Sequence, residues 1–115
     1  MCGFFIVLNL KNHSDNKQID YDFAKKCSGQ IAYRGPDQTN EYISDNGSFF
    51  SHHRLSIIDL SNRSSQPHLS KNKQNIICFN GEIYNYKELR SDLLTEDISG
   101  DTELISEVFS RKPDP

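Results

Sequence analysis

The stretch EYISDNGSFFSHHRLSIIDL, residues 41–60, predicts the sheet around which this chain folds. Two β-prone runs flank Asn46-Gly47, a dipeptide that is a strong signal for a two-residue hairpin turn. His52 and His53 are neighbours in the second run, so we expect their side chains on opposite faces of a strand. The stretch therefore predicts two antiparallel strands joined at Asn46-Gly47.

Further strands are predicted on both sides of this hairpin. GFFIVLNL (3–10) is an apolar run of strand length, and QNIICFN (74–80) begins as a buried strand. A turn around Gly35-Pro36-Asp37 precedes the hairpin, and a polar loop over residues 61–73 follows it. These segments bring the expected number of strands to about five.

Three helices are predicted, each beginning at a side chain that favours the N-cap position. The expected caps are Asp20, Asn85 and Asp101, with Glu88 as the reciprocal capping residue of the second helix. The expected apolar faces are Phe23, Cys27 and Ile31 in the first helix and Leu104, Ile105, Val108 and Phe109 in the third. Because the strands mostly precede the helices, the pattern indicates an α+β fold.

The composition narrows the class of protein. The chain has 115 residues, enough for one small domain, and a net charge of −3. It has no basic cluster longer than Lys25-Lys26 and no apolar run near ~20 residues, so we expect neither nucleic-acid binding nor a membrane span. Three widely spaced cysteines indicate free thiols and a cytoplasmic location, and neither they nor the four histidines have metal-ligand spacing.

Cys2 is a candidate nucleophile. A free thiol has a pKa near ~8.5 and needs a base to react at neutral pH. A chain that begins with its nucleophile can use its own α-amino group as that base, provided that Met1 is removed. The alternative is that Cys2 is simply a buried apolar residue of an edge strand.

Other candidates suit a small amino-acid substrate. Asn80 and Gly81 could donate hydrogen bonds to an oxyanion, although Asn-Gly is also a common hairpin turn. Arg54 could bind a carboxylate with its forked donors, or could be an ordinary surface charge. Glu82 and Asp101 could bind an ammonium group, although Asp101 is also a good helix cap.

Taken together, six stretches resemble the glutamine amidotransferase domain of the asparagine synthetase family, a class II amidotransferase domain with an N-terminal nucleophile. They are MCG (1–3), RGPD (34–37), RLSIIDLS (54–61), QP (66–67), NGEIYNYKELR (80–90) and SGDTE (99–103). NGEIYNYKELR is specific, because it separates asparagine synthetase-like domains from relatives acting on sugars or purines. Tyr33 stands where the family often has His before RGPD.

The resemblance implies roles for particular residues. The implied catalytic residues are Cys2, with its own amine as base, and the oxyanion donors Asn80 and Gly81. Arg54 is implied to bind the glutamine carboxylate. The other implied substrate-binding residues are Leu55, Ile57, Ile58, Glu82 and Asp101.

The implied fold is the αββα sandwich of N-terminal-nucleophile hydrolases, with two antiparallel sheets covered by helices. The family domain runs well beyond residue 115, so we expect residues 1–115 to be the N-terminal part of a type-2 glutamine amidotransferase domain and the sandwich to be incomplete. The synthetase domain is expected to be absent from this chain.

The implied reaction is glutamine hydrolysis through a thioester on Cys2, releasing ammonia for ATP-dependent amidation of an acceptor such as aspartate. No cofactor is expected in this domain, since ATP and Mg²⁺ serve the synthetase domain. The expected partners are glutamine, a synthetase domain or subunit, and a second copy of the chain. The alternative is a catalytically silent remnant that acts as a binding or assembly module.

Overall fold

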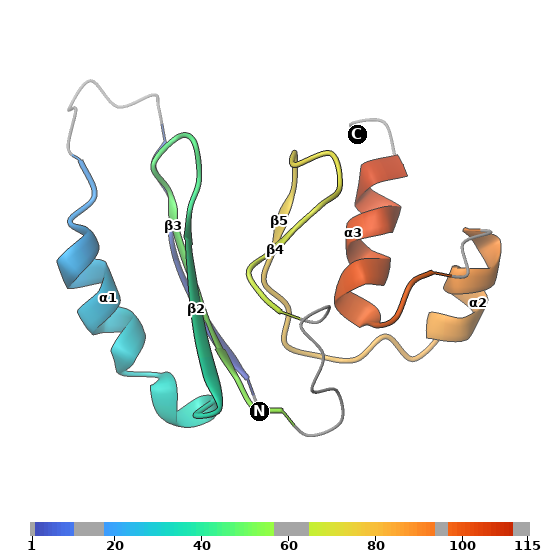
Figure 1. The fold of residues 1–115 in the computed structure, drawn as a ribbon, viewed down its shortest axis with the longest axis horizontal. Helices are drawn as coiled ribbons and strands as arrows, with labels where there is room; N and C mark the ends of the chain where they lie inside the picture. Colours follow the sequence, from blue (N-terminus) through green and yellow to red (C-terminus); the bar gives the residue numbers. More distant parts are fainter. Residues whose placement is uncertain (1, 11–17, 57–64, 94–96, 112–115) are drawn as a thin grey trace. The chain divides into compact units, whose positions relative to one another are not determined.

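The computed structural model describes residues 2–10, 18–56, 65–93 and 97–111 (Figure 1). It divides the chain into two compact units, Met1–Ile57 and Ile58–Pro115. The elements of the first unit are β1 (Gly3–Val7), α1 (Tyr21–Gly29), the 3₁₀ helix η1 (Ala32–Arg34), β2 (Gln38–Ile43) and β3 (Phe49–Arg54). Those of the second unit are β4 (His68–Leu69), β5 (Ile76–Ile77), α2 (Tyr86–Asp92) and α3 (Asp101–Arg111).

The predicted hairpin is confirmed as β2 and β3. β3 is the central strand of an antiparallel sheet with the order β1-β3-β2, and each of its residues is buried. The connecting loop covers residues 44–48, so it is longer than the two-residue turn we expected. Gly47 adopts a φ of +85°, a left-handed conformation that glycine reaches without steric cost. The Gly47 N–H donates to the Ser44 carbonyl at 2.8 Å and closes the loop.

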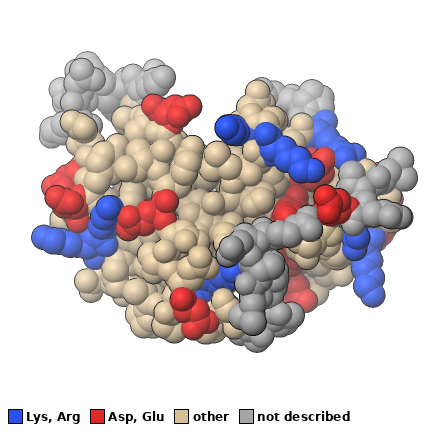
Figure 2. All heavy atoms as spheres, viewed as in Figure 1, with Lys and Arg blue, Asp and Glu red and all other residues tan. Residues whose placement is uncertain are grey.

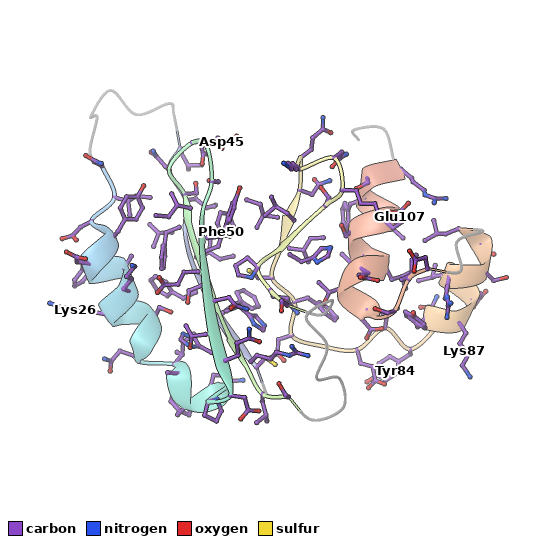
Figure 3. All side chains as sticks on the ribbon, viewed as in Figure 1. Lys26, Asp45, Phe50, Tyr84, Lys87 and Glu107 are labelled. Carbon is purple, nitrogen blue, oxygen red and sulfur yellow. The ribbon has the colours of Figure 1, made fainter. Side chains whose placement is uncertain are left out.

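Helix α1 covers one face of this sheet, and its predicted apolar face is wrong by one position. Asp20 caps the helix as expected, because its Oδ1 accepts a hydrogen bond from the Phe23 N–H at 3.0 Å. The buried residues are Ala24 and Ser28, whereas Phe23 is 65% exposed. Small side chains allow the helix to lie close to the strands. Phe50 lies on the side of the sheet away from α1 (Figure 3).

A buried polar network joins α1 to the sheet. The Ser28 hydroxyl donates to the Ser51 hydroxyl at 2.7 Å and lies 2.8 Å from Nε2 of His53. The other ring nitrogen of His53, Nδ1, lies 2.9 Å from the Thr39 hydroxyl. These groups satisfy one another, so the layer between helix and sheet holds polar side chains without the cost of unpaired ones.

The second unit contains a two-stranded antiparallel sheet and two helices. β4 pairs with β5, with His68 opposite Ile77, and α3 packs against both β4 and α2. Strand β4 lies in the segment that we predicted as loop, because two residues of strand are too few to produce a pattern in the sequence. Leu104 is 1% exposed, as predicted for the apolar face of α3, but Phe109 is 63% exposed.

Of the other two predicted caps, Asn85 is confirmed in position and Asp101 is wrong. Asn85 is the N-cap residue of α2, but its side chain makes no capping hydrogen bond, so its half of the expected reciprocal pair with Glu88 is not formed. Helix α3 begins at Asp101 itself, and the Leu104 N–H bonds to the Gly100 carbonyl. The Asp101 carboxylate accepts from the Ile83 N–H instead, at 2.9 Å.

The described residues form five strands and three α-helices, in line with the predicted α+β class. The αββα layering stays a prediction. No helix in the described part of the chain is long and apolar enough to cross a membrane. Each of the two units shows both acidic and basic side chains on the face drawn in Figure 2.

Candidate functional site

The thiol of Cys2 lies against the end of β3. The Leu55 N–H donates a hydrogen bond to Cys2 Sγ over 3.4 Å, and Sγ lies 3.8 Å from the Leu55 carbonyl oxygen. Cys2 stands just before β1, which is an edge strand of its sheet. The structure thus brings two predicted site residues, 53 positions apart in the chain, into direct contact.

The RGPD segment, residues 34–37, holds this contact in place. Arg34 Nε donates to the Cys2 carbonyl at 3.4 Å. The Asp37 N–H donates to the Arg54 carbonyl at 3.0 Å, and its Oδ2 accepts from the Ser56 N–H at 2.7 Å. The segment therefore bonds to the chain on both sides of the Cys2–Leu55 contact. The sequence predicted a turn around Gly35-Pro36-Asp37 and a resemblance over RGPD, but gave no signal for this role.

Gly35 has no room for a side chain. A Cβ at this position would lie 2.2 Å from the His53 carbonyl oxygen and 2.6 Å from the Arg54 nitrogen. Both atoms belong to the backbone of the central strand, which cannot move without breaking its pairing with β1 and β2. Glycine at 35 is thus required by close approach of two backbones.

Gly35→Ala is expected to lower the free energy of unfolding by about 3 kcal/mol, the upper end of the usual cost of overpacking. Urea unfolding followed by circular dichroism measures it. The matched control is Gly29→Ala, because no heavy atom lies within 4 Å of the Cβ position at Gly29. Equal unfolding midpoints for the two variants would show that the close approach at Gly35 is absent.

Arg54 is only 7% exposed at the end of β3, so the alternative of an ordinary surface charge is wrong. A buried guanidinium needs polar partners, and its position next to Leu55 places it beside the thiol-binding segment. Ile57 and Ile58, the other predicted members of this wall, lie outside the described residues.

The second unit holds the remaining predicted residues. Asn80, Gly81 and Glu82 are exposed in the connection from β5 to α2. No strand follows them among the described residues, so the alternative of a hairpin turn at Asn80-Gly81 is wrong. The Cα of Gly81 lies against the Phe79 ring, since a Cβ there would come within 3.0 Å of it.

Glu82 and Asp101 line the same open hollow of the second unit. The Tyr84 side chain, 94% exposed, also borders this hollow (Figure 3). Two carboxylates at one hollow suit a cationic group such as an ammonium. Within the second unit, the structure thus brings together the two residues predicted to bind such a group.

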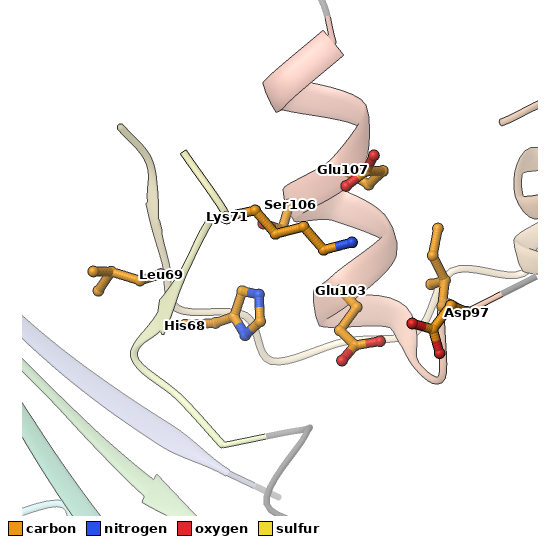
Figure 4. Close-up of a pocket in the computed structure, with 8 residues that line it drawn as sticks. His68, Leu69, Lys71, Asp97, Glu103, Ser106 and Glu107 are labelled. Atoms are coloured by element: carbon orange, nitrogen blue, oxygen red, sulfur yellow. The ribbon is translucent and has the colours of Figure 1, made fainter. Parts of the chain in front are cut away.

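A separate, smaller hollow of about 110 Å³ lies between β4 and α3 (Figure 4). His68 and Lys71 line it from one side, and Glu103 and Glu107 line it from α3. Burial lowers the pKa of His68, and the nearby Glu103 carboxylate opposes that shift. No group of three or more His, Cys, Asp or Glu side chains in the described ranges is arranged to hold a metal ion.

His52 is buried on the central strand. It is 1% exposed, and neither ring nitrogen has a partner among the described residues. Burial, followed by the neighbouring His53 and Arg54 charges, lowers the pKa of His52 to about 4. The folded state therefore holds this imidazole neutral, whereas in the unfolded chain it titrates near 6.5.

Acid is expected to destabilise the protein through His52. Because the pKa is depressed in the folded state, the unfolded state binds the proton first, so stability falls as the pH drops from about 6.5 to about 4. The loss over this interval is about 3 kcal/mol for a shift of this size. Urea unfolding at several pH values should show a flatter profile for His52→Leu than for wild type. Parallel profiles would contradict the assignment.

Comparison with known proteins shows the family to which the chain belongs. The chain matches the model described as "Glutamine amidotransferase domain" over residues 1–113. It is 35% identical over 114 residues to glutamine-hydrolyzing asparagine synthetase 2 of Bacillus subtilis (strain 168), covering 97% of this chain and 15% of that relative. It is 36% identical over 92 residues to glutamine-hydrolyzing asparagine synthetase B of Escherichia coli (strain K12), covering 80% of this chain and 16% of that relative. The chain belongs to the glutamine amidotransferase domain family.

Proposed function

We propose that this chain hydrolyses glutamine to glutamate and ammonia, with Cys2 as the nucleophile. The observation that carries the proposal is the hydrogen bond from the Leu55 N–H to Cys2 Sγ. It ties the one cysteine at the start of the chain to the segment in which the resemblance expects glutamine to bind. Membership of the glutamine amidotransferase domain family supports the same activity.

The chemistry proceeds in two steps. Cys2 Sγ attacks the side-chain amide carbon of glutamine and transfers its proton to the α-amino group that removal of Met1 exposes. The carbonyl oxygen becomes an oxyanion, which needs hydrogen-bond donors, and the resemblance assigns this role to the Asn80 side chain and the Gly81 N–H. The C–N bond then breaks, and the nitrogen takes the proton and leaves as ammonia. Water attacks the thioester, the C–S bond breaks, and glutamate and the free thiol result.

The fate of the ammonia belongs to a larger assembly. The chain spans 15–16% of the length of the two relatives named above, both of which are called asparagine synthetases. A synthetase domain or subunit that activates aspartate with ATP and Mg²⁺ would use the ammonia. Residues 1–115 would then be the N-terminal part of the glutaminase half of such an enzyme.

The direct test is a glutaminase assay on the full chain with Met1 removed. Glutamate and ammonia should appear in equal amounts, and an electrophilic glutamine analogue should label Cys2 alone. A chain that folds but produces neither product nor label would refute the proposed activity. The silent binding or assembly module would then be the better account.

Arg54→Ala is expected to raise the KM for glutamine by roughly 10–100-fold, the effect of losing a charge-assisted hydrogen bond to the substrate carboxylate. The turnover number should change less, because this contact is the same in ground state and transition state. Arg54→Lys is the matched variant, since it keeps the positive charge but lacks the forked N–H donors of the guanidinium. Its KM should lie between those of the wild type and Arg54→Ala. Unchanged KM in folded Arg54→Ala would remove Arg54 from the substrate site.

A further inference from the structure

Gln66 connects two segments that the proposed function uses. Gln66 is buried, with only 7% of its surface exposed. Its Oε1 accepts a hydrogen bond from the Phe79 N–H at 2.5 Å, and its Nε2 donates to the Thr102 hydroxyl at 3.1 Å. Phe79 immediately precedes Asn80, and Thr102 immediately follows Asp101. One buried amide therefore joins the proposed oxyanion donors to the first turn of α3.

The other end of the same loop is bound to the same helix turn. The Ile83 N–H donates to Oδ2 of Asp101 at 2.9 Å. The three residues between these anchors, Asn80, Gly81 and Glu82, are exposed, so burial does not hold them in place. Their position depends on the two anchored backbone amides on either side, Phe79 and Ile83. Asp101 already belongs to the proposed substrate site, whereas Gln66 has been given no role.

We infer that Gln66 is a positioning residue for glutamine hydrolysis, holding Asn80 and Gly81 where they can donate to the oxyanion. The inference rests on the proposed function. An oxyanion donor is effective only within about 2.7–3.1 Å of the developing charge. A displacement of about 1 Å at such a site can cost about 10²-fold in rate. An amide side chain suits the task, because it offers one acceptor to Phe79 and one donor to Thr102.

The test compares two substitutions at this position. Gln66→Met has a similar volume but neither hydrogen-bonding group, and it should lower kcat about 10–100-fold with KM nearly unchanged. Gln66→Glu keeps an acceptor for the Phe79 N–H, and the Thr102 hydroxyl can donate to its second oxygen, so kcat should recover most of this loss. Gln74→Met is the matched control, because Gln74 is an exposed glutamine of the same unit and should leave kcat unchanged.

A second readout separates this inference from the proposed function. Hydrogen exchange of backbone amides, measured on the full chain, should show that the Phe79 N–H loses protection in Gln66→Met and keeps it in Gln66→Glu. Wild-type chain without glutaminase activity overturns the proposed function and the catalytic part of the inference, while the exchange data still decide whether Gln66 anchors the loop. Active wild type with unchanged kcat in Gln66→Met overturns the inference alone.

Thr102→Val covers the case in which Gln66→Met fails to fold. It removes the acceptor of the Gln66 amide on α3 but leaves the bond to Phe79. We expect it to lower kcat in the same direction as Gln66→Met, though by less, with KM nearly unchanged. Folded Thr102→Val with wild-type kcat and wild-type exchange at Phe79 would contradict the connection between the loop and α3.

Discussion

Replacing Cys2 by alanine is expected to abolish glutamine hydrolysis. Removing a covalent nucleophile typically costs about 10⁴-fold or more, because no other group can form the thioester. Alanine is also small, so removal of Met1 should proceed as in the wild type. Glutamate release measured under saturating glutamine gives the result directly.

The other two cysteines are the controls for this variant. Burial raises the pKa of Cys78 to about 11, so its thiol is almost entirely protonated at neutral pH and is a poor nucleophile. Cys27 lies in α1, and within the described part of the chain it makes no hydrogen bond to the RGPD segment. Cys27→Ala should retain full activity. Cys2→Ala could retain some hydrolysis that disappears when Cys27 or Cys78 is also replaced. That result would show that one of these two thiols, and not Cys2, is the nucleophile.

Asn80→Ala carries the second largest expected effect. Loss of one oxyanion donor typically lowers kcat about 10²–10³-fold while substrate binding changes little. Asn80 is exposed and lies in no helix or strand, so the free energy of unfolding should stay near the wild-type value. Steady-state kinetics and urea unfolding of the same preparation measure both quantities.

Asn72→Ala is the matched control for Asn80→Ala. Asn72 is an exposed asparagine of the same unit, lies between β4 and β5, and is not among the residues that line the hollow of Glu82 and Asp101. We expect its kcat to match the wild type. A variant at Asn80 that loses stability rather than turnover would indicate a structural role for this side chain.

Local signals in the sequence predicted local structure well. Asn46-Gly47 predicted the hairpin, because the left-handed conformation at Gly47 depends on that residue alone. Asp20 predicted the start of α1, because its carboxylate accepts a hydrogen bond from a backbone amide only three residues away. Such interactions are complete within a few residues of the chain.

Interactions between distant residues overrode the local signals elsewhere. Asp101 was predicted as a cap, but the Ile83 N–H, 18 positions earlier, takes its carboxylate. Phe23 was predicted to face the core, but it is 65% exposed, and the small residues Ala24 and Ser28 are the buried ones of α1. The apolar period of a helix does not reveal how close its neighbour will come.

In the candidate site, too, the sequence predicted residues with a local signal and missed those whose contacts lie far along the chain. Residue type and spacing predicted Cys2, Arg54 and Asn80 as site residues, and these roles stay predictions. The sequence placed Gly35 only in a turn and gave Gln66 no role, because the close backbone approach at Gly35 and the hydrogen bond of Gln66 to Phe79 involve residues far along the chain. Both residues belong to motifs of the resemblance, RGPD and QP, and contact segments 13 or more positions away.

The central claim is that Cys2 acts as an N-terminal nucleophile. The chain is prepared once with Met1 removed and once with an uncleavable extension before Cys2, and intact mass verifies each amino terminus. Glutamate release is then measured for both at equal concentration. The account predicts that the processed chain hydrolyses glutamine and that the extended chain does not, although its thiol is still present. Equal activity in the two preparations would contradict the claim, because the base that activates the thiol would then lie elsewhere in the protein.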